Sequence, residues 1–484
     1  MSISKRDAYL QRWKEAQELA EEMLPIIGRL YRDRGLVLRI YGRPLNNAST
    51  IDILKAHRFV KQYEGKALDI SESFAVLQAL AELRLAPARL DLGRLAVAYG
   101  KLAEPRPALT EWLREELAEI ADSDEPMREA PQDVVLYGFG RIGRLLARLL
   151  IEKTGAGNKL RLRAIVVRPN DRPDDLDKRA SLLRRDSVHG PFNGSIFTVP
   201  EDNAIVANGN YIQVIYANSP AEIDYTAHDI HDALILDNTG KWRDEAGLSQ
   251  HLEAKGASCV LLTAPGKGDL KNIVFGVNDD AITADDRILS AASCTTNAIT
   301  PVLKVINDRF GIAHGHVETV HAYTNDQNLT DNYHKGARRG RSAALNMVLT
   351  ETGAAKAVSK ALPELAGKLT GNAIRVPTPN VSLAVLNLTL GETTDRDALN
   401  AYLRDAALYS ELAEQIDYTA STEVVSTDLV GSRHAGVIDA TSLIVEDNHC
   451  VVYVWYDNEV GYSCQVVRIA QEMAGLHFPR LPRH

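Results

Sequence analysis

The stretch DVVLYGFGRIGRLLARLLIEK, residues 133–153, determines the fold of the larger part of this chain. It begins with a short run of apolar and β-branched residues, turns at three glycines and continues as an amphipathic helix; the strand-like LRLRAIVV follows at 160–167. A strand, a helix and a second strand in this order form a βαβ unit with parallel strands. The sequence therefore predicts a doubly wound α/β domain that starts near residue 133.

The three glycines of this turn, Gly138, Gly140 and Gly143, have the spacing G-x-G-x-x-G. The first glycine permits a tight turn, the second lets a pyrophosphate approach the backbone, and the third lets the helix pack closely against the strand. The helix N-terminus then faces the phosphates. Alone the pattern is weak evidence, but the strand before it and the helix after it favour a dinucleotide-binding site.

The end of the second strand bears on the choice between NAD and NADP. A carboxylate at this position usually accepts hydrogen bonds from the adenine ribose. Here the strand ends in VVRPND, so Arg168 stands close to the expected position and Asp171 follows a few residues later. Arg168 is either an ordinary solvated charge or a group that receives a 2′-phosphate. We expect NAD, bound through Asp171, with NADP as the alternative.

Composition indicates an ordinary globular protein with two or three domains, since 45% of the 484 residues are hydrophobic and 25% are charged. The formal net charge of −9 gives no reason to expect nucleic acid or an anionic membrane as a partner. No apolar run reaches the roughly 18 residues that span a bilayer. The charged N-terminus does not have the pattern of a secretory signal, so we expect a cytoplasmic protein.

The four cysteines are far apart and show no metal-ligand spacing, so neither a disulfide framework nor a metal site is expected. Cys259 and Cys450 lie in apolar, strand-like runs, where a small buried side chain is the simplest interpretation. Cys294 differs, because SCTTNAITPVL places it at the start of a helix. A helix N-terminus and a nearby imidazole lower the pKa of a thiol and hold the nucleophilic thiolate. His321, at the end of a strand-like run, is the candidate imidazole.

Residues 1 to about 125 have mainly helical patterns. One apolar stripe contains Leu10, Trp13, Ala20, Leu24, Ile27 and Leu30. Ser49 or Thr50 is a plausible N-cap for the next helix, and the acidic, proline-containing segment 121–133 is the best linker candidate. We expect a helical domain that packs on the rest of the protein or between subunits.

Seven motifs follow one another in the remainder of the chain: GFGRIGR, DSVHG, SCTTN, HAYTNDQ, TGAAKAV, RVPTPNVS and WYDNEVGYS. Together they resemble the glyceraldehyde-3-phosphate dehydrogenase family over residues 133–484. The resemblance implies an α/β Rossmann dinucleotide-binding domain at 131–293 and 458–484 and an α+β catalytic domain at 294–457. The first 130 residues, a mainly α-helical extension, have no counterpart in the common form of that family.

The resemblance also implies a role for individual residues. Cys294 matches the nucleophile and His321 the base. The pocket for the substrate's own phosphate is matched by Thr324, Asp326 and Arg375. The pocket for inorganic phosphate is matched by Ser293, Thr295, Arg339, Thr352 and Gly353, with Arg338 or Arg341 as alternatives to Arg339. Besides the three glycines, the cofactor site is matched by Arg141, Ile142, Asp171, Thr239, Thr263, Asn458 and Tyr462.

The implied activity is the reversible, phosphorylating oxidation of glyceraldehyde 3-phosphate by NAD(P), through a cysteine thioester, in a homotetramer. Erythrose 4-phosphate is an alternative substrate, although TGAAK and RVPTPNVS look more like the triose enzyme. A second alternative is a regulatory protein that only binds the cofactor. The complete set of catalytic and phosphate-binding residues favours the enzyme, because a binding protein has no use for it.

Two residues depart from the family pattern. Tyr137 stands before the glycine turn where asparagine is usual. Glu351 stands in TETG where a serine is common, close to the expected inorganic-phosphate pocket. Its carboxylate either weakens phosphate binding or points into solvent.

Overall fold

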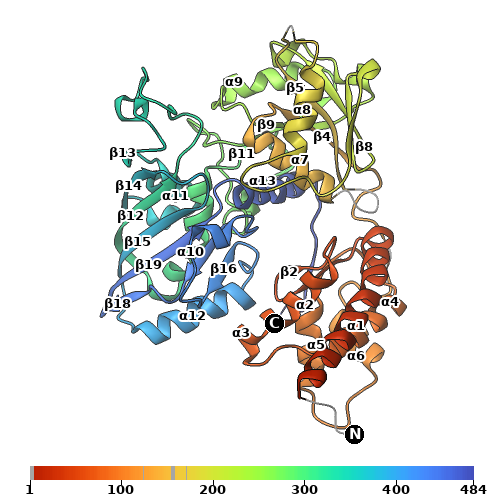
Figure 1. Ribbon diagram of the computed structural model, residues 1–484. Coiled ribbons are helices and arrows are strands. Elements are labelled where there is room, and N and C mark those ends of the chain that lie inside the picture. The colour runs from red at the N-terminus through yellow and green to blue at the C-terminus, as the bar shows by residue number, and fades with distance from the viewer. Residues whose placement is uncertain (1–4, 124, 154–158, 171, 484) are drawn as a thin grey trace. The chain divides into compact units, whose positions relative to one another are not determined.

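The computed structural model describes four stretches of the chain: residues 5–123, 125–153, 159–170 and 172–483. They form two compact units, each described by itself below (Figure 1). Asp171, the expected ribose contact, lies outside the described residues. Within these stretches, no helix is both long enough and apolar enough to cross a membrane.

The first unit consists of helices and one small sheet. Its helices are α1 (Lys5–Arg34), α2 (Thr50–Phe59), α3 (Lys61–Glu64), α4 (Ile70–Glu82), α5 (Leu92–Gly100) and α6 (Leu109–Glu116). Its strands are β1 (Val37–Ile40), β2 (Arg43–Pro44), β3 (Arg89–Asp91) and β20 (Arg480–Leu481), in the order β2-β1-β3-β20. Ser49 is the N-cap of α2: it accepts a hydrogen bond from the Asp52 N–H, and Asp52 accepts one from the Ser49 N–H.

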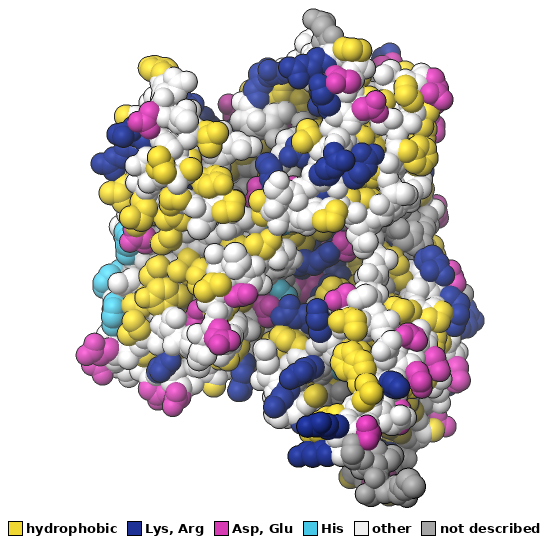
Figure 2. Space-filling view, viewed as in Figure 1, with side chains coloured by type: hydrophobic (Ala, Val, Ile, Leu, Met, Phe, Trp, Pro, Cys, Tyr) yellow, Lys and Arg dark blue, Asp and Glu magenta, His cyan; other side chains and the backbone are white. Residues whose placement is uncertain are grey.

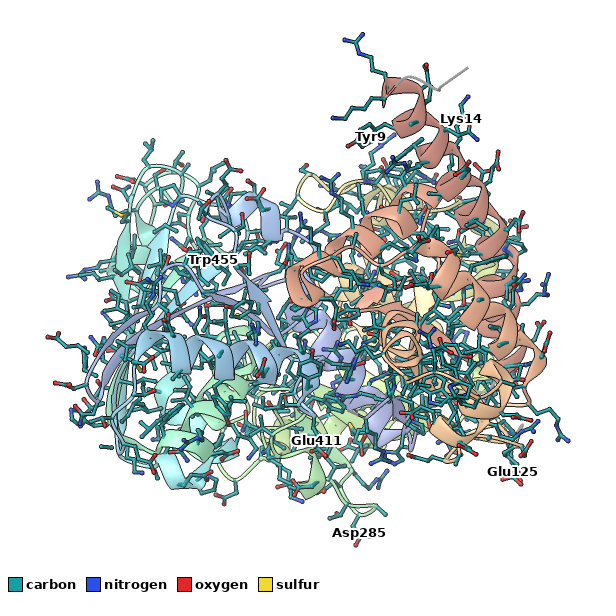
Figure 3. All side chains as sticks on the ribbon, turned by 90° about the horizontal axis from the view of Figure 1, so that it is seen from below. Tyr9, Lys14, Glu125, Asp285, Glu411 and Trp455 are labelled. Carbon is teal, nitrogen blue, oxygen red and sulfur yellow. The ribbon has the colours of Figure 1, made fainter. Side chains whose placement is uncertain are left out.

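Helix α1 buries only the second half of its apolar stripe. The buried residues are Ala20, Met23, Ile27 and Leu30. Leu10 and Trp13, expected in the same stripe, are 55% and 47% exposed. Tyr9 and Lys14 also project from these first turns (Figure 3). The expectation was therefore wrong for the first turns, because the neighbouring elements of the unit cover only the later ones.

The last residues of the chain complete the small sheet. Strand β20 runs parallel to β3, with Leu481 beside Leu90, and the Arg89 N–H donates to the Pro479 carbonyl at 2.8 Å. The Leu481 side chain is buried. The sequence analysis assigned residues 458–484 to the dinucleotide-binding domain, but the contacts of residues 475–483 place them in the first unit. The unpaired edge of β3 provides the backbone partners that hold them there.

Lys159 also belongs to the first unit. Its ammonium nitrogen lies 4.6 Å from the centre of the Tyr31 ring and 5.6 Å from that of the Phe478 ring. Burial lowers the pKa of this ammonium to about 8. The aromatic faces therefore compensate part of the solvation that the cation loses.

The second unit begins with the doubly wound sheet, as expected. Its strands are β4 (Gln132–Tyr137), β5 (Leu160–Val167), β6 (Ile196–Val199), β7 (Ala204–Ala207), β8 (Asn210–Tyr216), β9 (Ala233–Asp237), β10 (Ala257–Leu262) and β11 (Ile288–Ser290). Its helices are α7 (Arg141–Lys153), α8 (Asp175–Arg184), α9 (Glu245–Ser249) and α13 (Val460–Met473). The strand order is β11-β10-β9-β4-β5-β8-β7-β6, and all neighbours are parallel except at the β6–β7 and β7–β8 pairs.

Strand β4 lies between β5 and β9, where the order of the strands reverses. All six of its residues are buried, as expected for a central parallel strand. In sheets of this kind a ligand binds beyond the carboxyl ends of the strands at such a reversal. The glycine turn follows β4 at this point.

The rest of the second unit is an α+β domain with one mainly antiparallel sheet. Its strands are β12 (Ile312–Ala322), β13 (Val348–Thr350), β14 (Leu369–Val376), β15 (Ser382–Leu390), β16 (Ile416–Thr419), β17 (Gly436–Asp439), β18 (Ile444–Glu446) and β19 (His449–Tyr456). Its helices are α10 (Cys294–Phe310), α11 (Ala354–Ala361) and α12 (Arg396–Tyr409). The strand order is β13-β14-β12-β15-β19-β17-β16, with β18 beside β19. Apolar residues of α10, α11 and α12 form one core with β12, β15 and β19.

We predict that deletion of residues 476–484 destabilises the first unit and leaves the second folded. The deletion removes β20 and the buried Leu476 and Leu481, and each buried leucine contributes about 1.5–3 kcal/mol. Hydrogen exchange should become faster in β1 and β3, while cofactor binding persists.

The control is Arg483→Ala, which removes only an exposed ion pair with Glu119 and should change stability by less than about 1 kcal/mol. Unchanged exchange in β3 after the deletion would show that the C-terminal strand does not stabilise this unit.

Candidate active site

The start of α10 and the end of β12 bring Cys294 and His321 together. The Cys294 Sγ lies 3.5 Å from the His321 Nε2. The His321 Nδ1 lies 2.7 Å from the Ala322 carbonyl oxygen, which only accepts hydrogen bonds. Nδ1 therefore carries the hydrogen, and Nε2 is left to accept a proton from the thiol.

Burial determines the charge state of this pair. It raises the pKa of the Cys294 thiol, although the Arg375 guanidinium acts in the opposite direction. Burial and, to a smaller extent, the Arg375 cation lower the pKa of His321 to about 3. The sequence analysis expected the helix start and the imidazole to hold a thiolate. In the structure burial opposes the charged form of both groups, while the 3.5 Å contact lets the imidazole take the proton of the thiol.

Strand register places the groups around this pair. Strands β12 and β14 are parallel, with His321 beside Arg375, so both side chains emerge at the same edge of the sheet. On the other side of β12, strand β15 begins at Ser382, whose neighbour on β19 is Tyr456. The Ser382 hydroxyl accepts a hydrogen bond from the Ala322 N–H at 3.0 Å and donates one to the Asn458 Oδ1 at 2.9 Å.

Tyr456 is a site residue that the sequence analysis missed. Its buried hydroxyl lies 3.0 Å from the Thr295 Oγ1 and 2.6 Å from the Thr319 Oγ1, and its ring meets the His321 ring edge-on. It therefore ties the first turn of α10 to β12. The only signal in the sequence was a tyrosine at the end of an apolar strand, which does not distinguish it from an ordinary core residue.

The residues expected at the substrate phosphate form one cluster. The Arg375 Nη1 donates to the Thr324 Oγ1 at 3.0 Å, and Thr324 donates to Asp326. Arg339, expected in the other phosphate pocket, donates to Asp326 at 2.8 Å and to Thr350 at 3.0 Å. Although burial acts to raise the pKa of Asp326, the hydrogen bond from Thr324 and the two guanidinium groups lower it.

The other residues expected at inorganic phosphate are more dispersed. The Ser293 hydroxyl caps α10 by accepting the Thr296 N–H at 3.0 Å, and the Thr295 hydroxyl faces Tyr456. Thr352 accepts the Ala354 N–H at the start of α11. In the described part of the chain, no hydrogen bond joins Thr352 or Gly353 to Cys294. Glu351 is exposed, which agrees with the alternative in which its carboxylate points into solvent.

The glycine turn has the backbone that a dinucleotide site requires. Gly138 has φ of +97°, a conformation that favours glycine. A Cβ on Gly143 would lie 2.3 Å from the Gly138 carbonyl oxygen, so only glycine fits there, whereas Gly140 faces open space. Thr239 and Thr263 follow the neighbouring strands, and both make hydrogen bonds to Asp237.

A cavity of about 420 Å³ opens beside this turn. Its lining includes the glycine turn, Tyr137, Arg168, Thr239 and Trp242. The Tyr137 ring lies 5.9 Å from the Trp242 ring, and burial raises the pKa of its hydroxyl to about 12, so it stays protonated. The cavity, the turn and the helix start together fit the phosphates and one base of a dinucleotide.

The remaining expected cofactor residues hold the backbone around the site. The guanidinium of Arg141 is paired with Glu459 and, at 2.5 Å, with Asp186, so its backbone N–H is the group left for a phosphate. The Tyr462 hydroxyl donates to the Ala292 carbonyl at 3.0 Å, close to Cys294 in the chain. Ile142 lies in the first turn of α7.

A mainly parallel sheet with a dinucleotide turn, joined to a domain with a partly buried thiol beside a buried imidazole, defines a dinucleotide-dependent oxidoreductase. The family descriptions that match are the glyceraldehyde 3-phosphate dehydrogenase NAD binding domain, over residues 132–245, and the C-terminal domain of the same enzyme, over residues 293–458. The chain belongs to the glyceraldehyde-3-phosphate dehydrogenase family, whose members are phosphorylating dehydrogenases that use NAD(P).

The relatives differ in how much of the chain they match. The glyceraldehyde-3-phosphate dehydrogenase of Zymomonas mobilis is 39% identical, covering 70% of this chain and 98% of the relative. Glyceraldehyde-3-phosphate dehydrogenase 1 of Bacillus subtilis is 41% identical with the same coverage. A glyceraldehyde-3-phosphate dehydrogenase-like protein of Pseudomonas aeruginosa is 60% identical and covers 95% of this chain and all of the relative. The last match must therefore include most of the N-terminal region.

We predict that Cys294→Ser abolishes nearly all activity while cofactor binding remains, and that iodoacetate labels Cys294 before the other cysteines.

His321→Asn, which removes the proton acceptor 3.5 Å from the sulfur, should lower the turnover rate by about 10²–10⁴-fold. Cys259→Ser is the control and should keep both activity and labelling at Cys294. Full activity in Cys294→Ser, or unchanged turnover in His321→Asn, would remove the residue concerned from the mechanism.

The pH dependence of thiol alkylation tests the electrostatics of the pair. Because the Arg375 cation favours the thiolate, Arg375→Gln should raise the pKa of Cys294. The rate of reaction with uncharged iodoacetamide follows the thiolate fraction, so its profile should move to higher pH. Arg309→Gln, at the far end of α10, should leave the profile in place. A profile unchanged in Arg375→Gln would show that this cation does not act on the thiol.

Proposed function

We propose that this protein catalyses the reversible, phosphorylating oxidation of glyceraldehyde 3-phosphate to 1,3-bisphosphoglycerate, with NAD(P) as the hydride acceptor. The observation that carries the proposal is the 3.5 Å contact between Cys294 and His321, flanked by the Arg375–Thr324–Asp326 cluster. A thiol with its own proton acceptor suits attack on an aldehyde, and an arginine with a hydroxyl suits binding of a phosphate dianion.

The chemistry assigned to the chain's own residues runs through a thioester. As the Cys294 sulfur attacks the aldehyde carbon, its proton passes to the His321 Nε2, and His321 then gives this proton to the oxygen of the adduct. His321, neutral again, then removes the hydroxyl proton of this hemithioacetal; a nicotinamide held beside it would supply the hydride acceptor. Inorganic phosphate then attacks the thioester carbon, and the bond to sulfur breaks to release the acyl phosphate and restore the thiol.

Cationic residues support an anionic substrate. A second cavity of about 440 Å³ is lined by Lys241, Arg243, Lys267, Lys335 and Arg339, among others. A concentration of positive charge next to the site attracts phosphorylated molecules in a protein whose net charge is −9. Arg339 connects this cavity to the phosphate cluster through Asp326.

Erythrose 4-phosphate is the alternative substrate, since the same thiol, imidazole and arginine serve either aldehyde. The motifs TGAAK and RVPTPNVS favour the triose phosphate, as does the word glyceraldehyde in the names of the relatives. A purely regulatory, cofactor-binding role is less favoured, because it does not need a thiol in contact with an imidazole.

We also propose that the protein acts as a homotetramer in the cytoplasm. Four apolar side chains on the loop between β12 and β13 are more than three-quarters exposed: Leu329, Tyr333, Leu345 and Met347. Figure 2 shows hydrophobic side chains on this projecting loop at the upper left. Exposed apolar residues grouped in this way support contact with a second copy of the chain.

We predict that the purified protein reduces NAD or NADP with glyceraldehyde 3-phosphate only when inorganic phosphate is present. The comparison is kcat/KM for glyceraldehyde 3-phosphate, erythrose 4-phosphate and unphosphorylated glyceraldehyde, each with and without phosphate. A higher kcat/KM for erythrose 4-phosphate would select the alternative substrate. Turnover that does not depend on phosphate would contradict phosphorolysis of the thioester, and no turnover with any aldehyde would favour the regulatory role.

A further inference from the structure

We propose that the cavity beside the glycine turn contains a 2′-phosphate subsite centred on Arg168, so that the protein prefers NADP to NAD. The proposal rests on the proposed dehydrogenase function and specifies its cofactor. The juxtaposition that carries it is an exposed arginine at the end of β5, without a partner among the described residues, and two further cations that line the same cavity.

The backbone places Arg168 where the adenine ribose is expected. It directly follows Val167, the last residue of β5, and the Val167 carbonyl accepts the Ala217 N–H at 3.0 Å. The chain at this point is therefore fixed against the neighbouring strand β8. Pro169 further restricts Arg168 to an extended conformation. Since the pyrophosphate lies at the glycine turn after β4, the end of the adjacent strand β5 reaches the ribose.

The Arg168 side chain is free to bind an anion. It is exposed and lines the cavity, and within the described stretches it has no hydrogen bond or ion pair. Its positive charge also acts on Tyr137, which lines the same cavity: it opposes the rise that burial causes in the pKa of the Tyr137 hydroxyl. A guanidinium can bind a phosphate through two parallel N–H groups, which gives both strength and direction.

Two more cations line the same cavity. Arg179, on α8, donates its Nε to Asp175 at 2.6 Å, so its plane is held in one orientation. Lys241, after β9, lies with its nitrogen 4.3 Å from the centre of the Trp242 ring. A 2′-phosphate carries a charge of about −1.5 to −2, so a group of cations suits it better than a neutral hydroxyl.

Two carboxylates of the described residues near the cavity, Asp175 and Glu222, have other partners. Among the described residues that line it, none is acidic. Asp175 accepts hydrogen bonds from Arg179, Asn170 and Tyr216. Glu222 accepts the backbone N–H groups of Asn218 and Ser219. Neither of these two carboxylates is therefore left to accept a hydrogen bond from the 2′-hydroxyl of NAD. The positive charges of Arg168, Arg179 and Lys241 favour a phosphate at this position.

The test is binding of two nucleotides that differ only in the 2′-phosphate, 2′,5′-ADP and 5′-AMP, measured by calorimetry on the full-length protein. We expect 2′,5′-ADP to bind at least about tenfold more tightly. Arg168→Gln should weaken 2′,5′-ADP by about tenfold or more, the loss expected for a charge-assisted hydrogen bond, and change 5′-AMP by less than about twofold. Lys178→Gln, an equal change of charge on α8 at a residue paired with Asp174, should affect neither.

Kinetics provide the second measurement. The ratio of kcat/KM for NADP to that for NAD should exceed one in the native protein and fall in Arg168→Gln. Tighter binding of 5′-AMP, equal losses for both nucleotides in Arg168→Gln, or a loss of 5′-AMP affinity in Asp171→Asn would overturn the proposal in favour of NAD. Preference for 2′,5′-ADP without any phosphate-dependent aldehyde oxidation would keep this subsite and reject the proposed function instead.

Discussion

The contact between the Cys294 sulfur and the His321 imidazole depends on two backbone positions that separate parts of the chain hold in place. Before Cys294, the Asn297 amide donates to the Ala291 and Ser293 carbonyls, which fixes the turn that leads into α10. After His321, the Ala322 N–H donates to Ser382. A displacement of either element by about 1 Å would break the proton path, because hydrogen bonds weaken steeply with distance and angle.

Burial explains why this pair needs such support. Removing thiolate and imidazolium from water is costly, so burial works against the charged form of each group. The Arg375 cation acts against that preference for the thiol.

Local pattern was enough to predict the dinucleotide-binding domain, because a glycine turn between a strand and a helix is set by neighbouring residues. The helix start at Cys294 was predictable for the same reason. Tyr456 was not, since its hydroxyl reaches Thr319 only through the register of the three strands β12, β15 and β19, and reaches Thr295 from the same position. The spacing of residues in the sequence also does not show that the Thr295 hydroxyl, expected to bind an anion, contacts the Tyr456 hydroxyl.

The N-terminal region shows a different limit of sequence reasoning. Its helical pattern suggested an appendage joined to the enzyme once, near residue 131. The first unit instead also includes Lys159 and residues 475–483, so the chain passes between the units more than once. A short segment such as β20 has no pattern of its own and becomes a strand only because β3 offers it an edge. Since this strand comes after the whole dehydrogenase part, the sheet of the first unit cannot be complete until the last residues of the chain are in place.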